Sequence, residues 1–160
     1  MVVKKLKINY FLIPIITVLV SYTGSIFTSM GINSGWYELI NKPTWTPPGS
    51  IIGIVWTIIF ILSTISALIV WNKLERDKRF WRIIYLFLLN AGLNIFWSFL
   101  FFAQGLIGLA VFEAILLSLT VFILIYLIWS KSKLAALLLV PYVLWGSFAS
   151  FLTYSVWILN

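Results

Sequence analysis

Five stretches of the chain carry no Asp, Glu, Lys or Arg, and they cover residues 8–37, 43–72, 83–112, 114–130 and 134–160. A helix that spans the hydrocarbon needs roughly 20 apolar residues, and an open sheet could not satisfy its backbone hydrogen bonds in lipid. The pattern therefore predicts an all-α membrane protein with five transmembrane helices in one domain. The expected helices are residues 9–30, 50–72, 80–103, 106–129 and 134–159.

The composition supports this interpretation. Hydrophobic residues make up 62% of the chain and charged residues 9%, with a mean hydropathy of +1.09, which leaves too little polar surface to coat a soluble globule. The net charge of +7 does not indicate nucleic-acid binding, because basic residues that flank apolar spans are a topology signal. We therefore expect the lipid bilayer, and no nucleic acid, as a partner.

The basic residues lie on one side of the predicted bundle. Of the 11 Lys and Arg residues, all but Lys42 occupy the segment before the first helix, the gap between the second and third, and the gap between the fourth and fifth. These residues are Lys4, Lys5 and Lys7; Lys73, Arg76, Lys78, Arg79 and Arg82; and Lys131 and Lys133. The three gaps share one face, so we predict a cytoplasmic amino terminus and an outer carboxyl terminus. The first apolar run is too long for a cleaved signal peptide and should be retained.

The connection between the first two helices, residues 31–49, is the long exception among short turns. Connections of this length are usually functional or disordered, and its aromatic and apolar content argues against disorder. We expect a structured lid stiffened by its prolines. The expected lid residues are Trp36, Pro43, Trp45, Pro47 and Pro48. The alternative for its tryptophans is an ordinary aromatic belt at the membrane surface.

The lid also carries a more specific pattern. Trp36-Tyr37, Leu39, Lys42-Pro43, Trp45 and Pro47-Pro48, followed by Trp56-Thr57, resemble the opening signature of the tryptophan-rich sensory protein family. This family is also called the translocator protein or peripheral-type benzodiazepine receptor family. Later segments agree: Asn94, Trp97 and Phe101-Phe102 resemble its third-helix motif, and Pro141-Tyr142, Trp145 and Phe148-Ala149 its fifth-helix motif.

The resemblance implies a five-helix bundle, commonly a homodimer, in a bacterial cell membrane. It implies binding of porphyrins and benzodiazepine-site drugs, and in some bacterial members light-dependent degradation of protoporphyrin. Animal members end their last helix with a sterol-recognition pattern that closes on a basic residue. Here Trp157 to Asn160 contain no Lys or Arg, so the pattern gives no support for sterol binding.

Helix spacing indicates which groups could share a pocket. Asn90, Asn94 and Trp97 lie on one stripe of the third helix, and amides in hydrocarbon should turn inward to find partners. The alternative role of such amides is glue between helices. Trp56, Phe60, Ser63 and Ala67 share a stripe of the second helix, and Tyr142, Trp145, Ala149 and Thr153 share one of the fifth, so the three stripes could line an aromatic cavity. The stripes, together with the resemblance, predict a ligand site at Tyr37, Trp56, Asn90, Asn94, Trp97, Tyr142, Trp145 and Ala149.

A flat apolar macrocycle suits such a site, because indole and phenol faces stack on it while an amide or hydroxyl reaches its edge. The chain contains no His and no Cys, so the common axial ligands of haem iron are almost absent. We therefore expect no metal site and no required cofactor, with metal-free protoporphyrin as a ligand.

Conventional acid–base or nucleophilic catalysis is not expected, since Glu113 is the single carboxylate within the spans. The resemblance leaves a photochemical reaction open, in which Trp56 and Trp145 act through oxidisable indoles. The chief alternative function is a small transporter of porphyrin or amphipathic cations, with Glu113 as a proton site. A structural alternative for Glu113 is a neutral carboxyl bonded to a neighbouring helix.

Overall fold

The computed structural model describes residues 7–160, so the predicted topology residues Lys4 and Lys5 lie outside the described residues. Five helical segments in this range are long and apolar enough to cross a membrane. They are Asn9–Asn33, Gly49–Lys73, Lys78–Ala103, Ile107–Trp129 and Lys133–Ile158. The prediction of an all-α integral membrane protein with five spans is confirmed.

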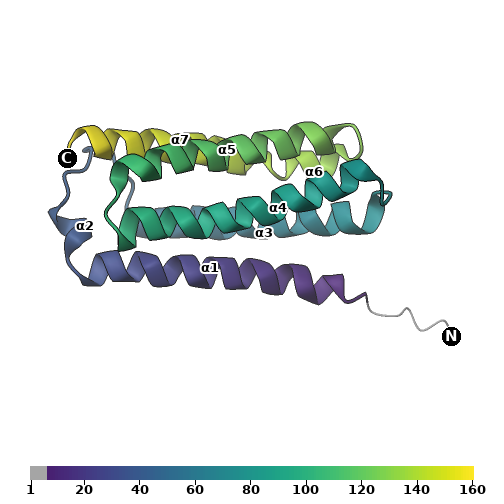
Figure 1. Cartoon of the computed structure of the whole chain (residues 1–160), viewed down its shortest axis with the longest axis horizontal. Coiled ribbons are helices and arrows are strands. Elements are labelled where there is room, and N and C mark those ends of the chain that lie inside the picture. The colour runs from purple at the N-terminus through teal and green to yellow at the C-terminus, as the bar shows by residue number, and fades with distance from the viewer. Residues whose placement is uncertain (1–6) are drawn as a thin grey trace.

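In Figure 1, α5 and α7 lie at the top, α4 and α3 overlap in the middle and α1 lies at the bottom. α5 (Ile107–Trp129) packs along α7 (Val140–Ile158), and α4 (Lys78–Ser98) packs against α5. α1 (Asn9–Asn33) lies on the opposite side of α4, where it also touches α3 (Gly49–Lys73). The most buried apolar side chains belong to the α3, α4, α5 and α7 side of the bundle. α1 and α3 are the two least buried spans.

Two spans depart from the straight helices that the sequence predicts. α4 continues into a π-helical turn, η1 (Phe99–Ala103), before the sharp connection to α5. The fifth span is divided into α6 (Lys133–Leu137) and α7, with Pro141 in the first turn of α7. Proline has no backbone N–H to donate to the carbonyl four residues earlier, so the α-helical ladder is interrupted at this position.

The connection between the first two spans is shorter than predicted, because α1 continues to Asn33. The lid is therefore residues 34–48, and it contains the single-turn α2 (Trp36–Leu39). Pro48 precedes the first residue of α3. The lid covers one end of the bundle, which we call the lid end.

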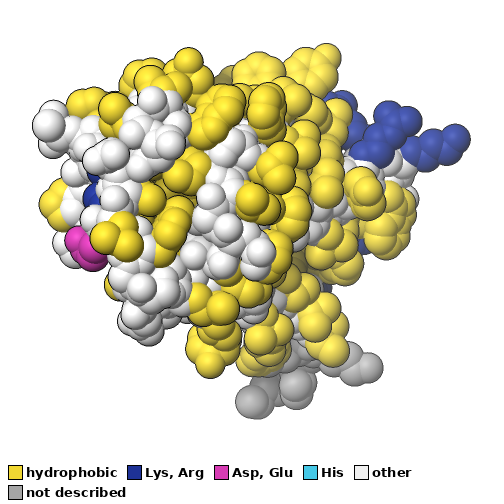
Figure 2. Space-filling view, turned by 60° about the vertical axis from the view of Figure 1, so that its left-hand side comes forward, with side chains coloured by type: hydrophobic (Ala, Val, Ile, Leu, Met, Phe, Trp, Pro, Cys, Tyr) yellow, Lys and Arg dark blue, Asp and Glu magenta, His cyan; other side chains and the backbone are white. Residues whose placement is uncertain are grey.

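The opposite end of the bundle, the basic end, carries the charged connections between α3 and α4 and between α5 and α6. On the face drawn in Figure 2 the surface is largely hydrophobic, and most Lys and Arg side chains gather at the end away from the lid. This asymmetry is what the positive-inside pattern requires, while the orientation itself remains a prediction.

Candidate functional site

A cavity of about 300 Å³ lies inside the membrane-spanning region between α1, α3 and α4. We call it the membrane cavity. Its lining comes from the first half of α1, the second half of α3 and the first half of α4, which places it toward the basic end. Aromatic side chains supply much of the wall, namely Phe60, Trp71, Trp81, Phe87 and Tyr142.

A chain of hydrogen bonds links the polar residues that line the inner side of this cavity. The Asn94 Nδ2 atom donates to the Tyr142 hydroxyl at 3.1 Å, and that hydroxyl donates to Asn90 Oδ1 at 2.9 Å. The Asn90 Nδ2 atom in turn donates to the Thr120 hydroxyl oxygen at 2.9 Å. The network joins α4 to α5 and α7, so the prediction that both amides turn inward holds for these contacts. It positions polar groups beside an apolar space.

Other polar atoms in the wall are unpaired. Asn9 Nδ2 and Ser63 Oγ are buried, and neither has a hydrogen-bond partner within residues 7–160. A buried amide or hydroxyl without a partner costs roughly 1–3 kcal/mol, which a bound guest or water would recover. These atoms are therefore available to the polar edge of a ligand.

The α1 wall of the cavity buries few of its side chains. Its buried residues are Asn9, Val20, Gly24 and Gly31, and most of its side chains face outward. One polar contact crosses from α1 to α3 beside the cavity, between the hydroxyl oxygens of Thr17 and Thr64 at 2.8 Å. α3 buries as small a share of its residues as α1, whereas α1 packs closely on α4 and η1 through Gly24 and Gly31. The boundary between α1 and α3 is therefore the sparsely buried side of the cavity.

The lid end differs, because its aromatic side chains pack on one another. Trp36 lies edge-on to Phe101 with ring centroids 5.4 Å apart, and Tyr37 lies 5.5 Å from Phe102. Trp97 stacks on Phe101 at 5.0 Å. We call these five residues the lid cluster. The predicted ligand residues Tyr37 and Trp97 thus fill space here rather than line the membrane cavity.

Two glycines permit close packing at the lid end, Gly31 between α1 and η1 and Gly105 between the turn after η1 and the lid. A side chain at Gly31 would meet the carbonyl oxygen of Phe102 at 2.7 Å, and Gly105, with φ +63°, lies directly against the Trp36 indole. Residues with a Cβ rarely adopt that φ, and here the indole leaves no room for one. The turn after η1 therefore depends on glycine to seat the lid cluster.

A latch of hydrogen bonds holds the lid to the end of α7. The Asn41 backbone N–H donates to Asn160 Oδ1 at 2.9 Å, and Asn160 Nδ2 donates back to the Asn41 carbonyl at 2.9 Å. Nearby, the Lys42 ammonium donates to the carbonyls of Tyr37 and Ile40 and lies 4.5 Å from the Tyr37 ring centroid. Trp45 stacks on Phe151 at 5.6 Å. The lid is closed in this state.

Of the predicted lid prolines, Pro43 accepts hydrogen bonds at its carbonyl from the backbone N–H and the hydroxyl of Thr46, at 3.0 and 2.7 Å. Pro47 and Pro48 lead into α3. Proline limits the conformations available to the unfolded segment, which lowers the entropic cost of closing the lid.

The remaining predicted ligand residues, Trp56, Trp145 and Ala149, are not on the lining of the membrane cavity. The Trp56 ring contacts Tyr142 edge-on at 5.7 Å and also Phe60 at 5.7 Å, so it backs two lining residues. Trp145 packs on Phe148 at 5.1 Å, and its buried indole N–H has no partner among the described residues. Ala149 lies on α7, where its carbonyl accepts from the Thr153 hydroxyl.

Glu113 is buried in α5 with 6% of its surface exposed. Neither carboxyl oxygen has a hydrogen-bond partner within residues 7–160, so the structure shows no bond from this carboxyl to a neighbouring helix in that range. A carboxyl in this environment is a candidate for proton binding. No group of three or more His, Cys, Asp or Glu that could hold a metal occurs in the described range.

Residues 12–158 match the TspO/MBR family. The chain belongs to this family. Tryptophan-rich protein TspO of Bacillus cereus is 38% identical over 130 residues, which cover 81% of this chain and 83% of the relative. Tryptophan-rich protein TspO of Archaeoglobus fulgidus is 37% identical over 146 residues, 88% of this chain and 90% of the relative. Translocator protein of Homo sapiens is 30% identical over 137 residues, 85% and 80% of the two chains. The resemblance identified from the lid and helix motifs is confirmed.

Membership in the TspO/MBR family does not locate the cavity. Its position comes from the structure. Sequence reasoning placed Phe60, Ser63 and Ala67 on an inward stripe of the second span, and all three line the cavity. It missed the contribution of α1, notably Asn9 and Thr17. Isolated polar residues at the inner positions of an otherwise apolar first span were the available signal.

Proposed function

We propose that this protein binds planar, largely apolar small molecules inside the membrane, with porphyrins and other tetrapyrroles as the principal class and benzodiazepine-site drugs as a second. The observation that carries the proposal is the membrane cavity, in which aromatic faces surround the edge groups of Asn90, Asn94 and Tyr142. Aromatic rings stack on a flat guest, while the amides and hydroxyl can bond its polar edge. Membership in the TspO/MBR family supports the choice of ligand class.

The size of the cavity defines how such a guest binds. Its volume of about 300 Å³ is at the lower end of the range for sites of drug-sized ligands. A tetrapyrrole needs more room, which outward movement of α1 would supply. A small drug would need less movement and should bind faster.

The chemistry of the chain favours metal-free tetrapyrroles over haem. There is no His or Cys in the sequence, and Met30 is exposed on the half of α1 near the lid, away from the cavity lining. Neutral side chains in the cavity can bond pyrrole or carboxyl edges but cannot serve as a strong axial ligand. Equal or tighter binding of haem with an axially ligated absorption spectrum would reject this preference.

The decisive experiment is a fluorescence-quenching titration with protoporphyrin, haem and a benzodiazepine-site drug. Ala67→Phe places a ring inside the cavity, whereas Ile65→Phe, on the exposed face of the same helix, is the matched control. Overfilling a packed space costs roughly 1–3 kcal/mol, so the first variant should lose about tenfold or more in affinity for protoporphyrin. Equal affinities in the two variants would place the site elsewhere.

A second candidate function is transport, and the unpartnered carboxyl of buried Glu113 is the observation that favours it. Uptake of porphyrin into proteoliposomes that follows a proton gradient, and that is lost in Glu113→Gln but kept in the exposed control Glu75→Gln, would support transport. Saturable binding without flux would reject it.

Photochemical turnover of the bound pigment would require oxidisable rings close to it. Trp56 meets this condition through its contacts with Phe60 and Tyr142, whereas Trp145 has no contact with the cavity lining among its described ring pairs. A defined product that falls in Trp56→Phe while binding persists would support this activity. We also propose, from the charge pattern and the family respectively, that the basic end faces the cytoplasm and that the protein forms a homodimer.

A further inference from the structure

An open groove at the basic end runs between the beginning of α4 and the end of α5. α4 contributes Lys78, Trp81, Arg82, Tyr85 and Leu86, and α5 contributes Ile123 and Leu127. Trp81 is the one lining residue that the groove shares with the membrane cavity. The groove faces outward from the bundle, so its occupant would come from the surrounding bilayer.

The lining of the groove changes from charged to apolar with depth. Lys78, Arg82, Tyr85 and Leu86 fall at i, i+4, i+7 and i+8, which places them on one face of α4. At 1.5 Å per residue, Leu86 lies about 12 Å farther along the helix than Lys78. Two cations therefore stand at the membrane surface, and an apolar track leads inward from them.

Two aromatic side chains, Trp81 and Tyr85, lie along α4 between the outermost cation, Lys78, and the aliphatic Leu86. Trp81 is 55% exposed and Tyr85 is 66% exposed, although each has a large apolar ring. Indole and phenol rings prefer the headgroup level of a bilayer, where one end is apolar and the other is wet. Along α4 the order is Lys78, Trp81, Arg82, Tyr85 and Leu86, so cations and amphipathic rings share the outer part of the groove and aliphatic side chains the inner part, as the headgroup region and acyl chains of a phospholipid require.

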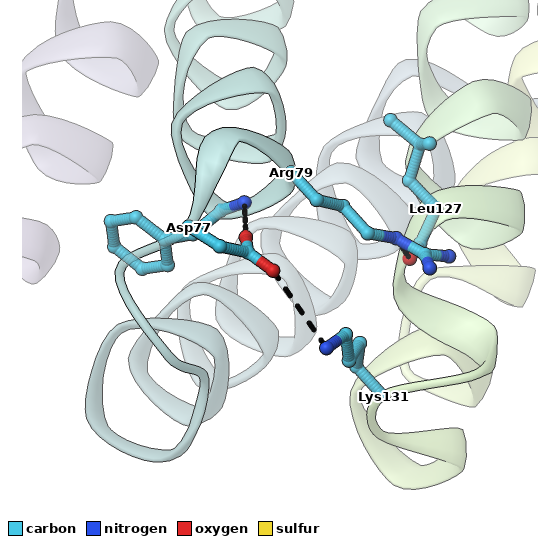
Figure 3. A network of polar contacts seen from close by, with 5 residues as sticks. Asp77, Arg79, Leu127 and Lys131 are labelled. Atoms are coloured by element: carbon cyan, nitrogen blue, oxygen red, sulfur yellow. Dashed lines mark hydrogen bonds and ion pairs between the residues drawn. The ribbon is translucent and has the colours of Figure 1, made fainter.

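Polar contacts hold the two helices of the groove together (Figure 3). The Arg79 Nε–H donates to the Leu127 carbonyl at 2.9 Å, and the Lys131 ammonium lies 3.8 Å from the Asp77 carboxylate. Asp77 also accepts from the Phe80 backbone N–H at 2.7 Å. That backbone hydrogen bond, with a smaller contribution from Lys131, holds the pKa of Asp77 below its usual value. The Asp77 carboxylate therefore already has a hydrogen-bond donor and a cation as partners within the protein.

The two cations of the groove differ from these neighbours. Within residues 7–160, neither Lys78 nor Arg82 donates a hydrogen bond to a protein acceptor or forms an ion pair. The nearest acidic residue in sequence, Asp77, is occupied by its own helix cap and by Lys131. An anion that approaches the groove would meet two free positive charges.

We propose that this groove binds one anionic phospholipid. Its phosphate would lie between Lys78 and Arg82, its glycerol region beside Trp81 and Tyr85, and one acyl chain along Leu86, Ile123 and Leu127. Basic pockets between transmembrane helices are suited to acidic headgroups, and the apolar track distinguishes a lipid from a free phosphate ion. The assignment is independent of the ligand of the membrane cavity.

The test compares phosphatidylglycerol with phosphatidylcholine by native mass spectrometry of the protein released from mixed-lipid nanodiscs. Lys78→Gln/Arg82→Gln removes both cations of the groove. Lys73→Gln/Lys133→Gln removes the same charge from the same end but outside the groove. With roughly 1 kcal/mol per basic residue, the first variant should lose about thirtyfold in its preference for phosphatidylglycerol. The control should keep its preference.

Two outcomes would overturn the proposal. An equal loss in both double variants would mean that diffuse basic charge, not this groove, attracts the lipid. Displacement of the bound lipid by glycerol phosphate at equal concentration would mean a site for the headgroup ion alone. Unchanged thermal unfolding of both variants in phosphatidylcholine shows that the comparison concerns folded protein.

Discussion

The lid end and the basic half of this bundle use the same kinds of side chain in opposite ways. At the lid end, Trp36, Trp97 and Phe101 pack on one another and leave their rings in mutual contact. In the basic half, Phe60, Trp71 and Tyr142 face an open cavity. A high content of tryptophan and phenylalanine therefore does not identify a binding site by itself. What matters is whether a neighbouring helix fills the space in front of the rings.

The second difference concerns how each region is held shut. The lid is fixed by the Asn41–Asn160 latch and by stacked rings. The cavity is closed on one side by α1, which has few buried residues. The comparison predicts that guests enter the cavity by displacement of α1 rather than of the lid.

The largest expected effect comes from breaking the inner network of the cavity. Asn90→Leu removes the acceptor for the Tyr142 hydroxyl and the donor to Thr120, and leaves both groups buried. We expect the free energy of unfolding to fall by about 2 kcal/mol, measured by thermal or denaturant unfolding in detergent. The control is Thr57→Val, which alters an exposed hydroxyl on α3. A loss no larger than in the control would show that the network does not hold the helices together.

Locking α1 tests whether this helix gates the cavity. The Thr17 and Thr64 hydroxyl oxygens are 2.8 Å apart, so Thr17→Cys/Thr64→Cys should form a disulfide in a chain that has no other cysteine. We expect the association rate of protoporphyrin to fall about tenfold when oxidised and to recover on reduction, as measured by stopped-flow quenching. The single cysteine variants serve as controls. An unchanged rate in the oxidised protein would move the gate to another element.

Opening the latch tests the other half of the comparison. Asn160→Ala removes the two side-chain hydrogen bonds to Asn41. At a net value of about 1 kcal/mol, amide hydrogen exchange in the lid should accelerate roughly fivefold, with little change in protoporphyrin affinity. Ser147→Ala, at an exposed position of α7, is the control. A large loss of affinity would assign the lid a direct role in binding.

The smallest effect concerns the titration of Tyr37. Burial, with a smaller contribution from Glu38, raises the pKa of this phenol above its ordinary value of 10.0. The folded lid therefore holds the phenol proton more tightly than the unfolded lid does, so lid stability is constant below about pH 9 and falls as the pH rises through and above 10. Hydrogen exchange of the lid across this range measures the change. Tyr37→Phe should remove the decline, and a decline that persists would assign it to another group.

The five spans were predictable because each contains a long run without charge, and charged or turn-forming segments separate these runs. Two details of the helices were not predicted. The π-helical turn at Phe99–Ala103 leaves no pattern in a uniformly apolar segment. The division of the fifth span was signalled by Pro141, since a proline removes a helix hydrogen bond, although Pro14 lies inside α1 without ending it.

The candidate site was predictable only in part for a related physical reason. Asn90 and Asn94 had to face inward, because amides in hydrocarbon seek partners, and both bond to Tyr142. Which helix covers them could not be read from the sequence. A lipid-facing side of a span is as apolar as a buried side, so periodicity does not orient α1 toward or away from the cavity. Trp97 was grouped with the amides by helix spacing and Tyr37 by the resemblance, and the structure places both in the lid cluster.

The shallow embedding of α1 has a consequence for how occupancy should be measured. A guest that passes this wall is drawn from the acyl chains, so the concentration that governs saturation is its mole fraction in the lipid phase. Apparent affinities expressed per volume of buffer would then shift with the lipid-to-protein ratio, while values expressed per mole of lipid would stay constant. Two hydrophobic compounds could rank in opposite order by the two measures.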